Sequence, residues 1–73
     1  MVLRMMYYEL NNNILTILTK NDETYSDIEY LDKFIARHES QINSIEIVGK
    51  IGQSLLLIDY IKSLDIKWSV SEC

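Results

Sequence analysis

The strongest constraint on the fold is an alternation between two spacings of apolar residues along the chain. A segment rich in Met and Tyr, at 4–10, and segments rich in β-branched residues, at 14–19, 42–48 and 66–70, are typical of strands. Apolar residues at helical spacing cover about 27–39 and about 53–64. The sequence therefore predicts the order β-β-α-β-α-β. Because strand–helix–strand units normally connect parallel strands, we expect an α/β (α+β) domain in which a short mixed sheet packs with two helices.

The size of the chain is enough for one small domain, spanning 1–73. Hydrophobic residues make up 48% of the sequence, which favours a folded core over a disordered chain. A core this small leaves a margin of only a few kcal/mol, and dimerisation is a common way to add to it. A homodimer is therefore one expected form of the protein.

The charge balance argues against general nucleic-acid binding. Seven Lys and Arg face eleven Asp and Glu, a net charge of −4. Such a chain repels phosphate backbones, whose binding depends mainly on neutralisation by Lys and Arg. We expect the partner to be another protein, with nucleic acid as the less favoured alternative.

The single cysteine, Cys73, and the single histidine, His38, make a metal site unexpected, because structural zinc sites need about four ligands. One cysteine also excludes an internal disulfide. No cofactor motif is present. Residues 1–10 contain one basic residue and no apolar run long enough for a signal or a membrane span. The expected location is cytoplasmic, without membrane association.

Local signals place the turns and helix ends. The asparagine run 11–13 favours a hairpin turn, because Asn tolerates the positive φ of tight turns. Apolar residues on both faces of the strand at 14–19 place it inside the sheet. Ser26 and Glu29 match a capping box, with Tyr25 and Tyr30 as a hydrophobic staple.

The best candidate for a functional site is the glycine loop Gly49-Lys50-Ile51-Gly52, between a predicted strand and a predicted helix. Free N–H groups and the helix dipole favour an anion at such a position, and Lys50 adds positive charge. The spacing matches neither the Walker phosphate loop nor the dinucleotide fingerprint. The alternative interpretation is that the two glycines only allow a sharp strand-to-helix turn.

The stretch from Val48 to Leu55 resembles the GXXG segment of KH domains, which clamps four nucleotides of single-stranded nucleic acid. In KH domains this loop follows a helix, whereas here it follows Ile45-Glu46-Ile47-Val48, a predicted strand. Convergence of Lys50, Lys62, Lys67 and Arg37 on one face would favour this function.

A broader resemblance covers most of the chain. The segment from Tyr7 to Ile17, followed by the helix and the strand at 42–48, resembles the opening of STAS domains, the fold of anti-sigma-factor antagonists. That family's Asp-Ser-x-Gly phosphorylation motif is absent, with only Ser54 near its position, and the chain stops before the family's last strand and helix. The resemblance implies a truncated STAS-like domain with a protein-binding role.

Helix 53–64 carries a second signal. Leu57, Ile58, Ile61 and Leu64 form its predicted inward stripe, while Leu55 and Leu56 lie on the outward side near the glycine loop. Either these leucines form an exposed patch, which typically marks an interface, or another segment covers them. His38 is expected to interact with the carboxyl end of its helix dipole. Trp68 is expected in the core, or as a partner anchor on an edge strand.

Without a catalytic constellation, the sequence predicts a small non-catalytic protein-interaction or regulatory module, such as a viral or bacterial modulator of a larger protein. The alternative is single-stranded nucleic-acid binding through the glycine loop. The predicted partner-binding residues are Gly49, Lys50, Ile51, Gly52, Gln53, Ser54, Leu55 and Leu56.

Overall fold

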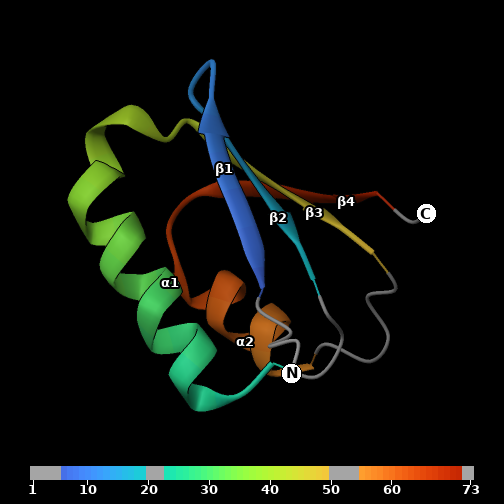
Figure 1. Ribbon diagram of the computed structural model, residues 1–73. Coiled ribbons are helices and arrows are strands. Elements are labelled where there is room, and N and C mark those ends of the chain that lie inside the picture. Colours follow the sequence, from blue (N-terminus) through green and yellow to red (C-terminus); the bar gives the residue numbers. More distant parts are fainter. Residues whose placement is uncertain (1–5, 20–22, 50–54, 72–73) are drawn as a thin grey trace.

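The computed structural model describes residues 6–19, 23–49 and 55–71. These residues form four strands, two α-helices and one short 3-10 helix in the predicted order β-β-α-β-α-β (Figure 1). The elements are β1 (Tyr7–Asn11), β2 (Ile14–Leu18), α1 (Tyr25–His38), η1 (Glu39–Gln41), β3 (Ser44–Val48), α2 (Leu55–Ser63) and β4 (Lys67–Ser71). The predicted fold class is confirmed.

The strands form one mixed sheet in the order β1-β2-β3-β4. β1 pairs antiparallel with β2, while β2, β3 and β4 are parallel. Asn12 and Asn13, with φ of 54° and 66°, form the turn between β1 and β2, as the asparagine run predicts. β2 is an internal strand, as its two apolar faces predict.

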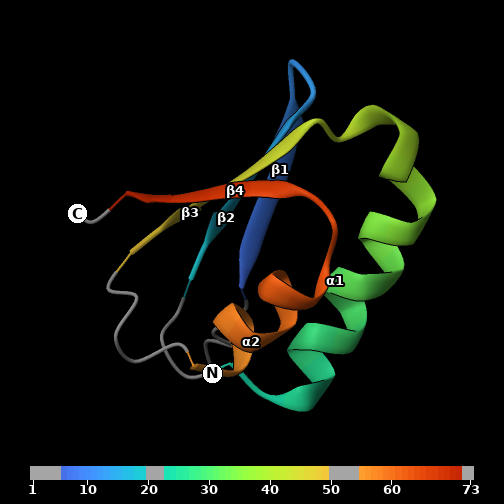
Figure 2. The ribbon, with the colours of Figure 1, turned by 180° about the vertical axis from the view of Figure 1, so that it is seen from behind.

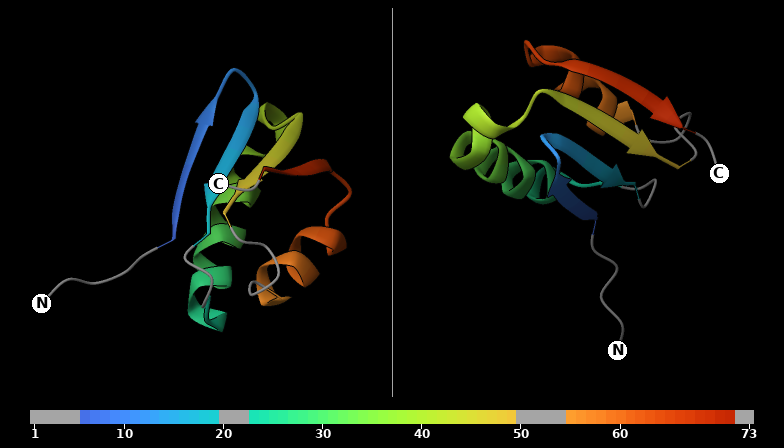
Figure 3. Two further views of the ribbon diagram at one scale, coloured as in Figure 1. Left: turned by 90° about the vertical axis from the view of Figure 1, so that its right-hand side faces the viewer. Right: turned by 90° about the horizontal axis from the view of Figure 1, so that it is seen from above.

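Both helices lie on the same face of the sheet, so the domain has two layers (Figures 2 and 3). The strands show this asymmetry, because Leu15 and Ile17 of β2 and Ile45 and Ile47 of β3 are buried while the residues between them are not. The buried core lies between the two layers. Its members are Met6, Leu15, Ile17, Leu31, Ile35, Ile42, Ile45, Ile47, Leu57 and Ile61.

The start of α1 corrects one sequence prediction. Thr24, not Ser26, is the N-cap residue: its hydroxyl accepts from the Asp27 N–H, and the Asp27 carboxylate accepts from the Thr24 N–H at 2.8 Å. The predicted staple is also wrong, since Tyr25 and Tyr30 are 81% and 63% exposed. Thr24–Asp27 and Ser26–Glu29 match the same sequence pattern, and the pattern alone does not distinguish them.

The end of α1 joins the core through an aromatic row. Tyr8 of β1 meets Phe34 edge-on, with ring centroids 4.8 Å apart, and Phe34 stacks on His38 at 4.3 Å. His38 Nδ1 donates to the Phe34 carbonyl oxygen at 2.9 Å. The predicted position of His38 in the last helical turn is confirmed. The short helix η1 follows α1, and β3 begins after it at Ser44, two residues later than the predicted start at 42.

The inward stripe of α2 is confirmed, with Leu57 and Ile61 fully buried and Ile58 and Leu64 packed on the core. The two helices are linked by a hydrogen bond of 2.8 Å from the Tyr60 hydroxyl to the Asp32 carboxylate. The side-chain alternation predicted for the last strand is also confirmed in β4.

Candidate functional site

The predicted glycine loop is described only at Gly49, which follows β3. The other loop and helix-start residues of the prediction, Lys50, Ile51, Gly52, Gln53 and Ser54, lie outside the described residues. The Gly49 N–H donates to the Ser71 carbonyl at 3.0 Å and extends the pairing of β3 with β4. Gly49 has a φ of +136°, and a Cβ atom there would collide with the Thr19 methyl group. Gly49 therefore has a structural reason to be glycine.

The two leucines predicted to form a patch differ in exposure. Leu55 is 70% exposed at the start of α2, and Leu56 is half-buried. Among the described residues of this region, Leu55 is thus the one large apolar side chain that is mainly exposed. A single exposed leucine does not by itself mark an interface, and the predicted site there stays a prediction.

Trp68 is half-buried and packs against the core from β4, which favours its core role. The basic residues named for nucleic-acid binding, apart from Lys50, do not share a face. Lys67 lies on the side of the sheet opposite the helices, whereas Arg37 and Lys62 are on exposed positions of α1 and α2.

A different surface stands out, namely the face of the sheet opposite the helices, which no described element covers (Figure 3). Its side chains form three cross-strand rows. We call these residues the uncovered face: Tyr7, Leu18, Val48 and Ser71 in the first row, Glu9, Thr16, Glu46 and Ser69 in the second, and Asn11, Ile14, Ser44 and Lys67 in the third.

The apolar side chains of the uncovered face are open to solvent. Tyr7, Ile14 and Leu18 are 55%, 42% and 44% exposed, and Val48 beside Leu18 is half-buried. Tyr7 and Leu18 are direct cross-strand partners, and Leu18 and Val48 are partners in turn. The first row is therefore a continuous apolar band over three strands, at the end of the sheet where Gly49 lies.

The middle row of the uncovered face is acidic. Glu9 and Glu46 lie on either side of Thr16. The Tyr7 hydroxyl donates to a Glu9 carboxylate oxygen at 3.0 Å, and this hydrogen bond raises the pKa of Tyr7. The face thus combines an apolar band with two carboxylates, and Lys67 is its only basic residue among the described positions.

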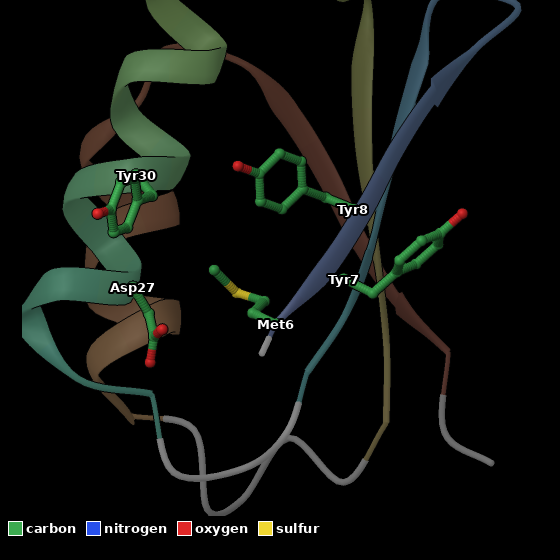
Figure 4. Close-up of a pocket in the computed structure, with 5 residues that line it drawn as sticks. All are labelled: Met6, Tyr7, Tyr8, Asp27 and Tyr30. Carbon is green, nitrogen blue, oxygen red and sulfur yellow. The ribbon is translucent and has the colours of Figure 1, made fainter. Parts of the chain in front are cut away.

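A pocket of about 350 Å³ opens beside β1 on the helix side of the sheet. It is lined by Met6, Tyr7 and Tyr8 at the start of β1 and by Asp27 and Tyr30 on α1. Figure 4 shows Met6 and Tyr8 pointing from β1 toward α1, whereas the Tyr7 ring points to the other side of the strand. This volume is near the lower end of the range for ligand sites, roughly 300–1,000 Å³. The walls are mainly thioether and aromatic groups, with one carboxylate.

The pocket adjoins a free strand edge. β1 is the first strand of the sheet and pairs only with β2 among the described strands. On the far side of β2, the Thr19 N–H donates to the Val48 carbonyl at 3.1 Å and the Asn13 carbonyl accepts from the Asn43 N–H at 2.8 Å. Odd-numbered positions of β2 therefore direct their backbone groups toward β3, and even-numbered positions direct theirs toward β1.

The register then fixes which groups of β1 face outward. The even-numbered residues of β2 oppose Tyr7, Glu9 and Asn11, which are the hydrogen-bonded pairs of the hairpin. Hydrogen-bonded and non-hydrogen-bonded pairs alternate in an antiparallel ladder. Tyr8 and Leu10 therefore direct their N–H and C=O groups away from β2, to the free edge beside the pocket.

Within residues 6–19, 23–49 and 55–71, no group of three or more His, Cys, Asp or Glu side chains is arranged to hold a metal ion. In the same part of the chain, none of the helices has both the length and the apolar character needed to cross a membrane.

Comparison with family models, with curated proteins and with solved structures finds no match to this chain. The resemblances to STAS and KH domains therefore stay predictions from the sequence. Class and function rest on the fold and on the surfaces described above.

Sequence reasoning missed both the uncovered face and the pocket. The apolar residues on both sides of β2 are a signal for such a face, but the same pattern is typical of any strand inside a sheet. The pocket joins Met6 and Tyr8 to Tyr30, more than twenty positions later in the sequence, and no local pattern connects them.

Proposed function

We propose that this protein is a non-catalytic protein-binding module whose partner docks on the uncovered face of the sheet. The observation that carries the proposal is the apolar band of Tyr7, Leu18 and Val48 on a sheet that helices cover on one side only. An apolar band of this kind gains free energy when a partner removes it from water, about 25 cal/mol per Å² of apolar surface. The cytoplasmic location expected from the sequence remains part of this proposal.

The charges of the uncovered face favour a particular partner chemistry. Glu9 and Glu46 lie beside the apolar band, and the chain as a whole carries a charge of −4. These charges attract Lys and Arg and repel phosphate, which favours a polypeptide over a nucleic acid. The partner we propose is a protein surface with aliphatic or aromatic groups flanked by basic residues.

The same charges disfavour a second copy of this chain on this face. A face-to-face homodimer would enclose Glu9 and Glu46 of both copies in one interface. Like charges brought together across an interface cost several kcal/mol. A different protein with basic side chains is therefore a better fit than self-association through the uncovered face.

The proposal is tested by two matched substitutions, Leu18→Arg on the uncovered face and Leu55→Arg at the start of α2. Both leucines are exposed, so each variant should keep the wild-type circular dichroism spectrum and thermal midpoint within a few degrees. Partner binding is compared by affinity capture from the native host with quantitative mass spectrometry. Substitution of a central interface residue typically costs about 2 kcal/mol or more of binding free energy, which lowers the affinity more than tenfold.

We expect Leu18→Arg to lose the captured partner and Leu55→Arg to retain it. Loss with Leu55→Arg alone would place binding in the region from Gly49 to Leu56 and would reject the uncovered face. Retention by both variants would also reject it. Glu46→Lys, which preserves the apolar band, should weaken capture because it repels a basic partner.

A further inference from the structure

We infer a second binding site at the free edge of β1, which takes an extended segment of another protein as an added fifth strand. This site borders the uncovered face, with which it shares Tyr7, and it rests mainly on other observations. They are the outward backbone groups of Tyr8 and Leu10 and the pocket of about 350 Å³ beside them.

The backbone of β1 determines the shape of the ligand. Tyr8 and Leu10 present N–H and C=O groups at strand spacing along the free edge. Only a chain in extended conformation places donors and acceptors at the same spacing over several residues. Strand addition of this kind takes its affinity from main-chain hydrogen bonds, and its specificity from pockets that receive alternate side chains.

The pocket determines which side chain such a segment needs. A residue paired with Tyr8 on an added strand has its side chain on the same face as Tyr8, which is the face toward α1. The pocket lies at this position, walled by Met6, Tyr8 and Tyr30. These walls fit a large apolar side chain such as leucine, phenylalanine or methionine.

The charges near the pocket indicate which residues should flank the apolar side chain of the ligand. Glu9 lies on the opposite face of β1, the face to which the neighbours of the apolar residue on an added strand direct their side chains. With the net charge of −4, this carboxylate favours basic residues beside the apolar one. The ligand class is thus an extended segment with one large apolar side chain and flanking Lys or Arg.

The probe is an acetylated and amidated octapeptide in which valine and threonine alternate and lysine occupies each end. Its central apolar position carries leucine, phenylalanine or methionine. The control peptide has the same side chains but is N-methylated at alternate residues, which removes the N–H groups on the edge facing β1. The readout is amide hydrogen exchange of the full-length protein by NMR.

In the free protein, the Tyr8 and Leu10 amides should exchange rapidly, while those of Tyr7 and Glu9 are protected by β2. At saturating peptide, exchange at Tyr8 and Leu10 should slow at least tenfold for one or more of the three peptides, and the methylated peptides should have no effect. The outward amides of the other edge strand, β4, provide an internal control and should not change.

Three results would overturn the inference: no slowing with any of the peptides, equal slowing with the methylated controls, or slow exchange at Tyr8 and Leu10 before peptide is added. The pocket is tested separately with Tyr30→Ala, which should weaken peptide binding at least threefold. Tyr25→Ala on the same helix removes a tyrosine that does not line the pocket and should leave the affinity unchanged. Equal affinity of Tyr30→Ala and wild type would overturn the role of the pocket.

Discussion

Gly49 and Thr19 lie so close together that a Cβ atom on Gly49 would collide with the Thr19 Cγ2 methyl group. The two residues follow neighbouring parallel strands, β3 and β2, at the carboxyl end of the sheet. This end of the sheet also carries the apolar band of the uncovered face. The contact between Gly49 and Thr19 therefore lies at the same end of the sheet as the surface that we propose for partner binding.

Gly49→Ala should lower the free energy of unfolding by about 1–3 kcal/mol, because a φ of +136° is strained for any residue with a Cβ atom. Urea unfolding measures the change. Thr19→Ser removes the methyl group and keeps the hydroxyl, which donates to Glu23 at 2.8 Å. In the Thr19→Ser background, Gly49→Ala should cost at least about 0.5 kcal/mol less. Equal costs in the two backgrounds would refute the contact.

Thr24→Ala should destabilise the domain by about 1 kcal/mol, because it removes the N-cap of α1 and half of the capping box. Ser26→Ala is the matched control, two residues later in the first helical turn. It should change the free energy of unfolding by less than about 0.5 kcal/mol. A larger loss with Ser26→Ala than with Thr24→Ala would restore the N-cap predicted from the sequence.

Tyr60→Phe should reduce stability by about 0.5–1.5 kcal/mol at neutral pH, because the hydrogen bond to Asp32 is lost. The substitution should also change how the free energy of unfolding depends on pH in alkaline solution. Burial and then the Asp32 carboxylate raise the pKa of Tyr60 from its ordinary value of 10.0. Above about pH 10 the unfolded chain loses this proton while the folded chain keeps it, so the free energy of unfolding falls as pH rises.

The Tyr60 effect is measured by urea unfolding between pH 7 and pH 11. The decrease in stability above about pH 10 should be smaller in Tyr60→Phe than in the wild type. Identical pH profiles of the two proteins would show that Tyr60 ionises equally in the folded and unfolded states.

The sequence predicts the element order because each element carries its own apolar period. Ile45 and Ile47 alternate with Glu46 in one strand, and Leu31 and Ile35 belong to a helical stripe, so their burial follows from local pattern alone. The prediction of the α1 N-cap is wrong because the local pattern there is ambiguous. Two overlapping capping patterns start at Thr24 and Ser26, and the packing of the helix decides between them.

The candidate surfaces depend on how elements far apart in the sequence pack together, which a local pattern does not show. Ile14 and Leu18 become an uncovered face only because both crossover helices lie on the same side of the sheet. The pocket requires Tyr8 and Tyr30 to meet across the two layers. The glycine loop, by contrast, was visible in the sequence, but Gly49 is explained by its backbone conformation and its contact with Thr19.

The most direct measurement of the central proposal is site-specific photo-crosslinking in the native host. In one variant a benzophenone side chain replaces Leu18 on the uncovered face. In a second variant it replaces Tyr25 on α1, which is more exposed than Leu18. Irradiated cells are analysed for covalent adducts of the protein. We predict a discrete adduct with one partner protein from position 18 and none from position 25. An adduct from position 25 alone, or equal labelling from both positions, would contradict docking on the uncovered face.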